Sequence, residues 1–277
     1  MWELPSKRVL PGFGISLGCS LFFTCLILLL PISALLMQLS NMTLEEYWNV
    51  VSNPQVLTAY KVTLISAGLA SIFNALFGML MAWILTRYNF PGRNFLDALI
   101  DLPFALPTAV AGLTLTELFS IHGWYGYLLS YLGIKVSYTW LGISVAMAFT
   151  SLPFVVRTVQ PVLEELGPEY EEAAETLGSS PKKSFYRVVL PEVGPALLVG
   201  TVLSFTRSLG EFGAVIFIAG NIAWKTEVTS LMIFVRLQEY DYPASSAIAS
   251  VILVTSLLLL AATNILQNRF GKRIGGD

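Results

Sequence analysis

The stretch "VTLISAGLASIFNALFGMLMAWILT", residues 62–86, holds no charged residue, and Lys61 and Arg87 stand directly on either side of it. The hydrocarbon layer of a bilayer is about 30 Å thick, and a helix needs about 20 apolar residues to cross it. The stretch therefore has the length and the composition of a transmembrane helix. It predicts that the chain is an integral membrane protein.

The composition of the whole chain leads to the same prediction. Of its 277 residues, 55% are hydrophobic and only 12% are charged, whereas a soluble domain carries about 25% charged residues. So few charges cannot cover the chain with a water-soluble surface. The two cysteines, Cys19 and Cys25, lie in the first apolar run and indicate neither a disulfide nor a metal site.

Five further apolar stretches extend the pattern to six transmembrane helices in a single domain, residues 1–277, so the expected fold class is an all-α membrane protein. Pro103 and Pro107 interrupt the third span, and Arg207 and Glu211 lie in the fifth. These two spans are expected to be irregular. The six spans are expected at about residues 15–39, 62–86, 102–121, 136–160, 193–219 and 242–268.

The basic residues between the spans predict the orientation. Six spans place both termini on the same side of the membrane, and the side that carries more Lys and Arg is the cytoplasm. With both termini inside, eleven basic residues are cytoplasmic and four are external, while Arg207 belongs to neither side. The inner set is Lys7, Arg8, Arg87, Arg93, Arg157, Lys182, Lys183, Arg187, Arg269, Lys272 and Arg273, and the outer set is Lys61, Lys135, Lys225 and Arg236.

One long charged segment lies on the inner side: "EELGPEYEEAAETLGSSPKKSFYRVVLPE", residues 164–192. Pro168 and the glutamates after it suit the first turn of a helix, and Gly178 is a residue at which such a helix commonly ends. Pro181 opens a second short helix that is expected to end near Leu190 and Pro191. The residues alone leave two interpretations open: a solvated helical hairpin, or a surface for a partner protein.

The spacing within this segment resembles the EAA loop of the permease subunits of binding-protein-dependent ABC importers. Val188 stands where that family usually has Ile, which is a mild departure. The resemblance implies a cytoplasmic coupling helix that docks on an ATPase subunit and transmits its motion. The matching residues are Glu172, Ala173, Ala174, Gly178, Leu190 and Pro191.

The resemblance extends over nearly the whole chain. The segments "DLPFALPTAVAGLTL", "FTRSLGEFGAVIFIAGNIAWKTEV" and "RLQEYDYPASSAIASVIL" are similar to the permeases of sulfate/thiosulfate ABC importers, the T subunits. This implies the type I ABC importer permease fold in a bacterial-type inner membrane. It also implies a second permease subunit in a heterodimer, two ATPase subunits and a periplasmic sulfate-binding protein. Molybdate and tungstate permeases, which share an element like "RSLGEFGA", remain the alternative within this class.

Motifs for catalysis are missing from the sequence. It has no G-x-x-x-x-G-K-S/T phosphate-binding loop, so ATP is expected to bind only to the partner ATPase subunits. His122 is the only histidine, which disfavours a metal site or a catalytic triad. We therefore expect no catalytic residue, no cofactor and no nucleic-acid partner. A single-component anion transporter is less favoured, because no inverted repeat is seen and the EAA-like loop would have no role.

Two charges in the fifth span are candidates for the translocation path. Arg207 and Glu211 are one helical turn apart, with Ser204 and Ser208 expected on the same side. A lone charge at the centre of a membrane helix costs roughly 2.5–3.5 kcal/mol. One interpretation is an ion pair that only fixes helix packing. The others are a path in which Arg207 offsets the repulsion of a dianion, or a gate.

The third span offers a second candidate. Pro103 and Pro107 lack an N–H donor, and a helix break at membrane depth is tolerated only inside protein or beside water. A path-lining or hinge role competes with a simple kink. Asp97 and Asp101 lie near the inner end of this span, and an interfacial position or pairing with Arg93 is expected for them.

Overall fold

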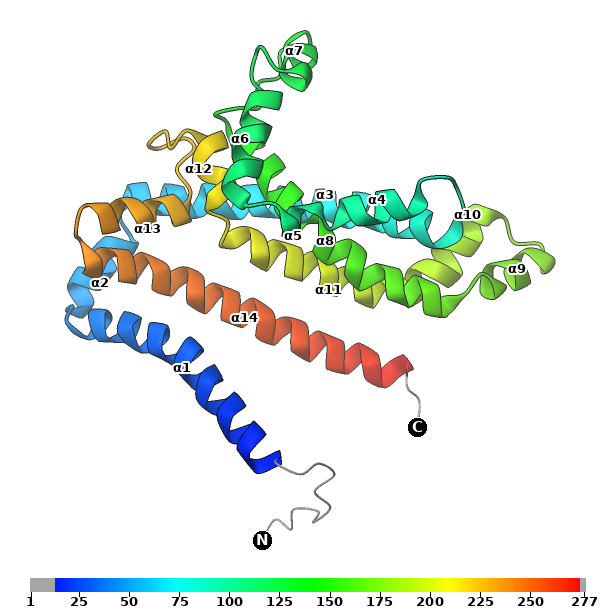
Figure 1. Cartoon of the computed structure of the whole chain (residues 1–277), viewed down its shortest axis with the longest axis horizontal. Helices are drawn as coiled ribbons and strands as arrows, with labels where there is room; N and C mark the ends of the chain where they lie inside the picture. Colours follow the sequence, from blue (N-terminus) through cyan, green and yellow to red (C-terminus); the bar gives the residue numbers. More distant parts are fainter. Residues whose placement is uncertain (1–12, 275–277) are drawn as a thin grey trace.

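The computed structural model describes residues 13–274, with side chains as far as residue 265, and every regular element in this part of the chain is a helix. The long helices run side by side (Figure 1). At one end of the bundle lie α9 (Glu169–Thr176) and α10 (Pro181–Ser184), and at the other α2 (Leu44–Val51) and α13 (Thr229–Gln238). The expected all-α class is confirmed.

Five helices of the described residues are long and apolar enough to cross a membrane. The expected spans 15–39, 62–86, 136–160 and 242–268 overlap four of them. Lys7 and Arg8, two of the basic residues expected inside, lie outside the described residues. The five helices are α1 (Phe13–Ser40), α3 (Pro54–Arg87), α8 (Trp140–Leu166), the continuous helix Pro181–Leu209, and Tyr242–Ile265, which is part of α14 (Tyr242–Ile274).

The third expected span, 102–121, is not one helix. It consists of α5 (Leu102–Ala105) and α6 (Thr108–Leu118), and the backbone between them is extended, with ψ of 134° at Leu106 and 128° at Pro107. The cause is local, because a proline disfavours helical backbone at the residue before it and cannot donate a hydrogen bond itself. A further short helix, α4 (Arg93–Ile100), precedes the pair. Another, α7 (Trp124–Ser130), projects from the bundle with α6 (Figure 1).

The fifth expected span, 193–219, is also divided. Helix α11 (Leu190–Leu209) stops at Gly210, Glu211 is not helical, and α12 (Gly213–Ala219) follows. The expectation that Arg207 and Glu211 share one continuous helix is therefore wrong. Glycine is a poor helix former, and the Glu211 carboxylate accepts a hydrogen bond from the Ala214 amide at 3.1 Å, as a capping residue does.

The charged segment 164–192, called the inner segment below after its predicted side, differs from its prediction at its end. The second short helix does not end near Leu190 and Pro191. Instead α10 passes through a π-helical turn, η1 (Phe185–Val189), directly into α11. The Leu190 amide donates to the Phe185 carbonyl, five residues back. Pro191 then falls in the first turn of α11, where the wider π-helical turn can absorb a proline that would otherwise break the helix.

A capping box begins α2, which connects α1 to α3 at the end of the bundle opposite α9 (Figure 1). Thr43 Oγ1 accepts a hydrogen bond from the Glu46 amide, and Glu46 Oε2 accepts one from the Thr43 amide at 2.7 Å. The hydrogen bond from the Thr43 backbone, followed by the one from its side chain, lowers the pKa of the Glu46 carboxyl. This reciprocal pair satisfies amides that a helix start leaves free.

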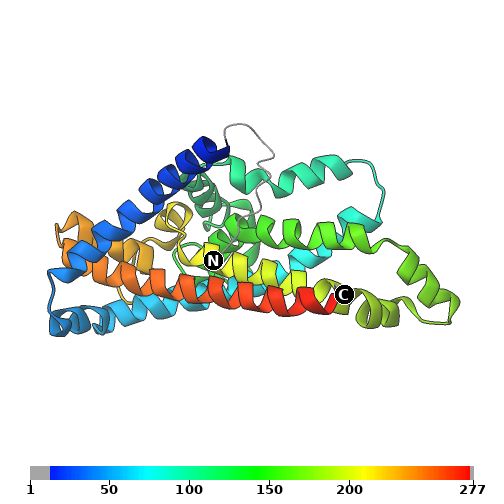
Figure 2. The ribbon, with the colours of Figure 1, turned by 90° about the horizontal axis from the view of Figure 1, so that it is seen from below.

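Helices α3, α8 and α11 form the centre of the bundle, and small residues let them approach closely. A Cβ atom at Gly78 of α3 would lie 2.9 Å from Val155 Cγ1 of α8, and one at Gly200 of α11 would lie 3.0 Å from Val155 Cα. Such contacts are typical of membrane helix interfaces. In contrast, α1 has no buried residue and runs obliquely along the outside, near α14 (Figure 2).

Helix α6 packs against α12 through Gly112. A Cβ atom there would overlap the backbone oxygen of Ala214 and lie 2.7 Å from its Cα. Because backbone atoms cannot move aside cheaply, Gly112→Ala is expected to destabilise the protein by about 1–3 kcal/mol. The thermal melting of the purified chain in detergent measures this. Gly68→Ala is the control, because a Cβ atom at Gly68 meets nothing within 4 Å; equal melting temperatures for the two variants would contradict the prediction.

Candidate functional site

The first part of the inner segment is presented outward. Helix α9 contains no buried residue. Within the EAA-like motif, Glu172 and Ala173 are exposed, Ala174 is half-buried, and the Leu177 side chain beside them is 89% exposed. Gly178 ends the helix region with φ of +81°, a conformation that favours glycine. The arrangement leaves a small-residue helix face open to a partner.

The second part of the motif has a different position. Leu190 is half-buried and Pro191 is exposed at the start of α11. Since α10, η1 and α11 form one continuous helix, the inner segment has a direct mechanical connection to the helix that carries Arg207.

Arg207 and Glu211 form an ion pair across the break after α11. Arg207 Nη1 lies 2.8 Å from Glu211 Oε2, although the geometry does not complete a hydrogen bond to that oxygen. The Glu211 side chain is 1% exposed, whereas the Arg207 side chain is 36% exposed. Glu211 is held from two more sides, because its Oε1 accepts from the Ala214 amide and its carbonyl accepts from the Ser230 hydroxyl at 2.7 Å. The buried carboxylate is thus fixed, and the arginine presents part of its charge to its surroundings.

The depth of Arg207 decides what these surroundings can be. At 1.5 Å per residue, Arg207 lies about 26 Å along α11 from Leu190, the first residue of that helix. Its helix neighbour Ser204 is hydrogen-bonded to Asn74, which lies about 20 Å along α3 from Arg87. Both lengths are shorter than the hydrocarbon layer of about 30 Å, so with Leu190 and Arg87 at one boundary we expect Arg207 to lie within the membrane. A guanidinium that faced lipid tails at this depth would be strongly unfavourable, so its exposed side faces water or another protein.

Ser204 and Ser208 do not lie on that exposed side. Both are fully buried and point between the central helices. The Ser204 and Ser208 hydroxyls donate to Ser151 Oγ of α8 at 2.9 and 3.1 Å. Asn74 Nδ2 of α3 lies 2.9 Å from Ser151 Oγ and 3.0 Å from Ser204 Oγ. The four residues predicted on one face are therefore divided: two join the helices, and Arg207 and Glu211 form a separate pair.

Sequence reasoning missed Asn74 and Ser151. The signal for Asn74 was present, because it is the one amide side chain in the uncharged stretch 62–86, and a strongly polar residue inside a span seeks a partner in the bundle. The sequence could not indicate which helix supplies that partner. Asn74 Oδ1 is buried and accepts no hydrogen bond from the described residues.

The two helix breaks lie side by side. A Cβ atom at Gly213, the first residue of α12, would overlap Thr108 Oγ1 and lie 3.0 Å from Thr108 Cβ, at the first residue of α6. The break at Pro107 in the third span thus adjoins the break at Glu211 in the fifth. Pro107 is exposed at this junction, whereas Pro103 is buried. Irregular backbone at membrane depth is concentrated in one place, next to the ion pair.

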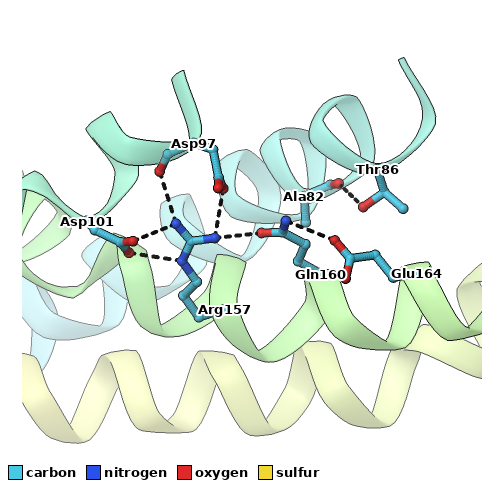
Figure 3. A network of polar contacts seen from close by, with 7 residues as sticks. All are labelled: Ala82, Thr86, Asp97, Asp101, Arg157, Gln160 and Glu164. Carbon is cyan, nitrogen blue, oxygen red and sulfur yellow. Dashed lines mark hydrogen bonds and ion pairs between the residues drawn. The ribbon is translucent and has the colours of Figure 1, made fainter. Parts of the chain in front are cut away.

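A polar network fastens the short helix α4 to α8 (Figure 3). Arg157 of α8 donates from Nε and Nη2 to the two carboxylate oxygens of Asp101, at 2.9 and 2.7 Å. Its Nη1 donates to Asp97 Oδ1 at 2.7 Å and to Gln160 Oε1 at 2.9 Å. Of the two alternatives expected for the aspartates, pairing with Arg93 is wrong, since the Arg93 side chain donates to Asn89 instead. Both acids precede the third span, so this arginine sets the position of the helix leading into the proline break.

The described residues contain no group of three or more His, Cys, Asp or Glu side chains that could hold a metal ion. Cys19 and Cys25 are free and exposed on α1.

Comparison with solved structures identifies the fold. The chain resembles a subunit of a bacterial ABC transporter involved in the import of the acidic polysaccharide alginate, with a TM-score of 0.76 over 92% of this chain and 94% of that chain. The two are only 19% identical, so the likeness concerns the fold alone. The expected importer permease fold is confirmed.

Comparison with known sequences gives much closer relatives. The chain is 74% identical over 276 residues to the sulfate transport system permease protein CysT of Escherichia coli (strain K12), and the match covers 100% of both chains. It is 45% identical over 258 residues to the protein of the same name from Synechocystis sp., covering 93% of this chain and 90% of that one. Residues 74–276 match the family described as "Binding-protein-dependent transport system inner membrane component". The chain belongs to this family of transport-system inner membrane components.

Proposed function

We propose that the chain is a translocation subunit of an ATP-driven importer for sulfate and thiosulfate. The observation that carries the proposal is the 74% identity over the full length to a sulfate permease protein. The chain itself performs no catalysis, and it works with separate ATPase subunits that bind and hydrolyse ATP. A periplasmic binding protein delivers the anion, and a second permease subunit completes the path. Both termini lie in the cytoplasm, as the distribution of basic residues predicts.

The arrangement of the charged residues supports a path for an anion. Arg207 is the half-exposed member of its pair, and its negative partner is buried. A guanidinium at membrane depth lowers the cost of bringing a dianion into a low-dielectric passage, and its planar fork matches tetrahedral oxyanions. Glu211 offsets much of the positive charge, which favours a weak, transient contact over a tight binding pocket. The two adjacent helix breaks at Pro107 and Glu211 provide the element that opens or closes.

Complementation tests the proposal. In an Escherichia coli strain that lacks its own CysT relative, expression of this chain should restore uptake of radiolabelled sulfate. Excess unlabelled thiosulfate should compete with it, and excess molybdate should not. A membrane-inserted chain that restores no sulfate uptake would refute the proposal. Competition by molybdate but not by thiosulfate would instead assign the importer to molybdate or tungstate.

A further inference from the structure

The last residue of α3, Arg87, is almost buried beneath the inner segment, with 10% of its side chain exposed. Its Nε donates to Glu171 Oε1 of α9 at 2.8 Å. Its Nη1 and Nη2 donate to the carbonyls of Leu163 and Gly167 at the end of α8, both at 3.0 Å. One guanidinium thus joins three helices.

Arg87 stabilises two parts of the structure that have few other contacts, the last carbonyls of α8 and helix α9. The last carbonyls of a helix such as α8 have no N–H donor within the helix, and a cation beside them is favourable. Helix α9 has no buried residue, and its main neighbours, α10 and η1, belong to the same inner segment. Apolar packing therefore does not fix α9 to the bundle. The charge-assisted bond between Arg87 and Glu171 attaches it to α3.

The last turn of α3 also contacts η1, the second helical part of the inner segment. Phe185 of η1 packs edge-on against Trp83, with ring centroids 5.2 Å apart. The Arg87 guanidinium carbon lies 5.5 Å from the centroid of the same Trp83 ring. Residues 83–87 of α3 therefore contact both α9 and η1.

We infer that Arg87 is a positioning residue that passes movement of α9 into α3 and α8. This route is additional to the direct continuation of η1 into α11. It reaches the same region, because Asn74 of α3 is hydrogen-bonded to Ser151 of α8 and to Ser204 of α11. The inference rests on the proposed function, since an ATPase partner must supply the movement of α9.

The test compares ATP consumption with transport in the complete complex, reconstituted with its second permease, ATPase subunits and binding protein. The ATP hydrolysed per sulfate imported is expected to rise about tenfold for Arg87→Gln, the factor that one lost charge-assisted hydrogen bond represents. Arg87→Lys should give a smaller rise, because an ammonium can pair with Glu171 but cannot span two carbonyls as well. Arg93→Gln is the matched control, since the Arg93 side chain donates only to Asn89 among the described residues, and its ratio should equal that of the wild type.

An unchanged ratio in assembled Arg87→Gln complex would overturn the inference. So would a parallel fall of hydrolysis and uptake in step with the amount of complex, because that would show a purely structural role. If Arg87→Gln does not assemble, Glu171→Gln decides: it keeps the arginine on the α8 carbonyls, and its ratio must still rise.

A second readout separates this inference from the proposed function. In the assembled complex without nucleotide, amide hydrogen exchange of residues 169–176 should be about tenfold faster in Arg87→Gln than in the wild type or in Arg93→Gln. Exchange at the wild-type rate would overturn the inference. This result does not depend on the transported anion, whereas a wild-type complex that imports no sulfate would refute the proposed function alone.

Discussion

Replacing Arg207 with glutamine is expected to abolish sulfate uptake, and replacing Glu211 as well is expected not to restore it. The single change removes the half-exposed cation of the proposed path. It also leaves Glu211 as a buried charge without its ionic partner, which typically costs about 3–5 kcal/mol. The single variant could therefore fail through folding or through transport, and the double variant is needed to separate these causes.

In Arg207→Gln/Glu211→Gln both charges are gone, so the buried site is again neutral. The side-chain carbonyl oxygen of the glutamine that replaces Glu211 can still accept from the Ala214 amide, as Glu211 Oε1 does at 3.1 Å. Assembly should return to the wild-type level while uptake stays absent, because an anion path has lost its cation. The amount of purified complex and the uptake of radiolabelled sulfate measure the two effects.

Arg236→Gln is the matched control for Arg207. Arg236 of α13 pairs at 2.8 Å with Glu239, the residue after that helix, and both side chains are partly exposed. Loss of such a surface pair costs at most about 1 kcal/mol, so uptake should be normal. If the double variant of Arg207 and Glu211 transports sulfate at the wild-type rate, the pair only fixes helix packing and the path does not use it.

Replacing Ala173 with tryptophan is expected to weaken the binding of the ATPase subunit to the permease and so to lower sulfate uptake. Ala173 is exposed on α9, a helix with no buried residue, so the bulky side chain disturbs nothing inside the bundle. We propose that an ATPase subunit docks on this face, where a tryptophan would overfill the small-residue surface at a cost of about 3 kcal/mol. That cost corresponds to a fall in uptake of about a hundredfold.

Three measurements check this prediction. Uptake and sulfate-stimulated ATP hydrolysis should both fall, while the melting temperature of the isolated permease stays at the wild-type value. Ala173→Ser keeps the side chain small and should retain most of the uptake. Normal uptake with Ala173→Trp would show that the ATPase does not contact this face of α9.

The hydrophobic pattern along the chain determined the fold class and the position of most helices, because membrane insertion depends on local composition. The uncharged run 62–86 forms most of α3, and the prolines at 103 and 107 predicted a break that the structure contains. The segment 164–192 was recognisable for the same reason, since glutamates after Pro168 and a glycine at 178 act on the backbone next to them.

The tertiary structure alone decided which polar groups meet. Asn74, Ser151 and Ser204 come from three different helices, and Arg87 reaches Glu171 only because α3 ends beside α9. The fifth span was expected to be irregular, but the place of its break at Glu211 was not predicted, since the stabilising contacts of the Glu211 carboxylate and carbonyl depend on α12 and on Ser230. Hydropathy and helix propensity are properties of a segment, whereas a hydrogen bond between helices depends on how they pack. For this reason the sequence determined the membrane helices and the family resemblance, and only the packing of α3, α8 and α11 decided how the ion pair, the two breaks and the inner segment are connected.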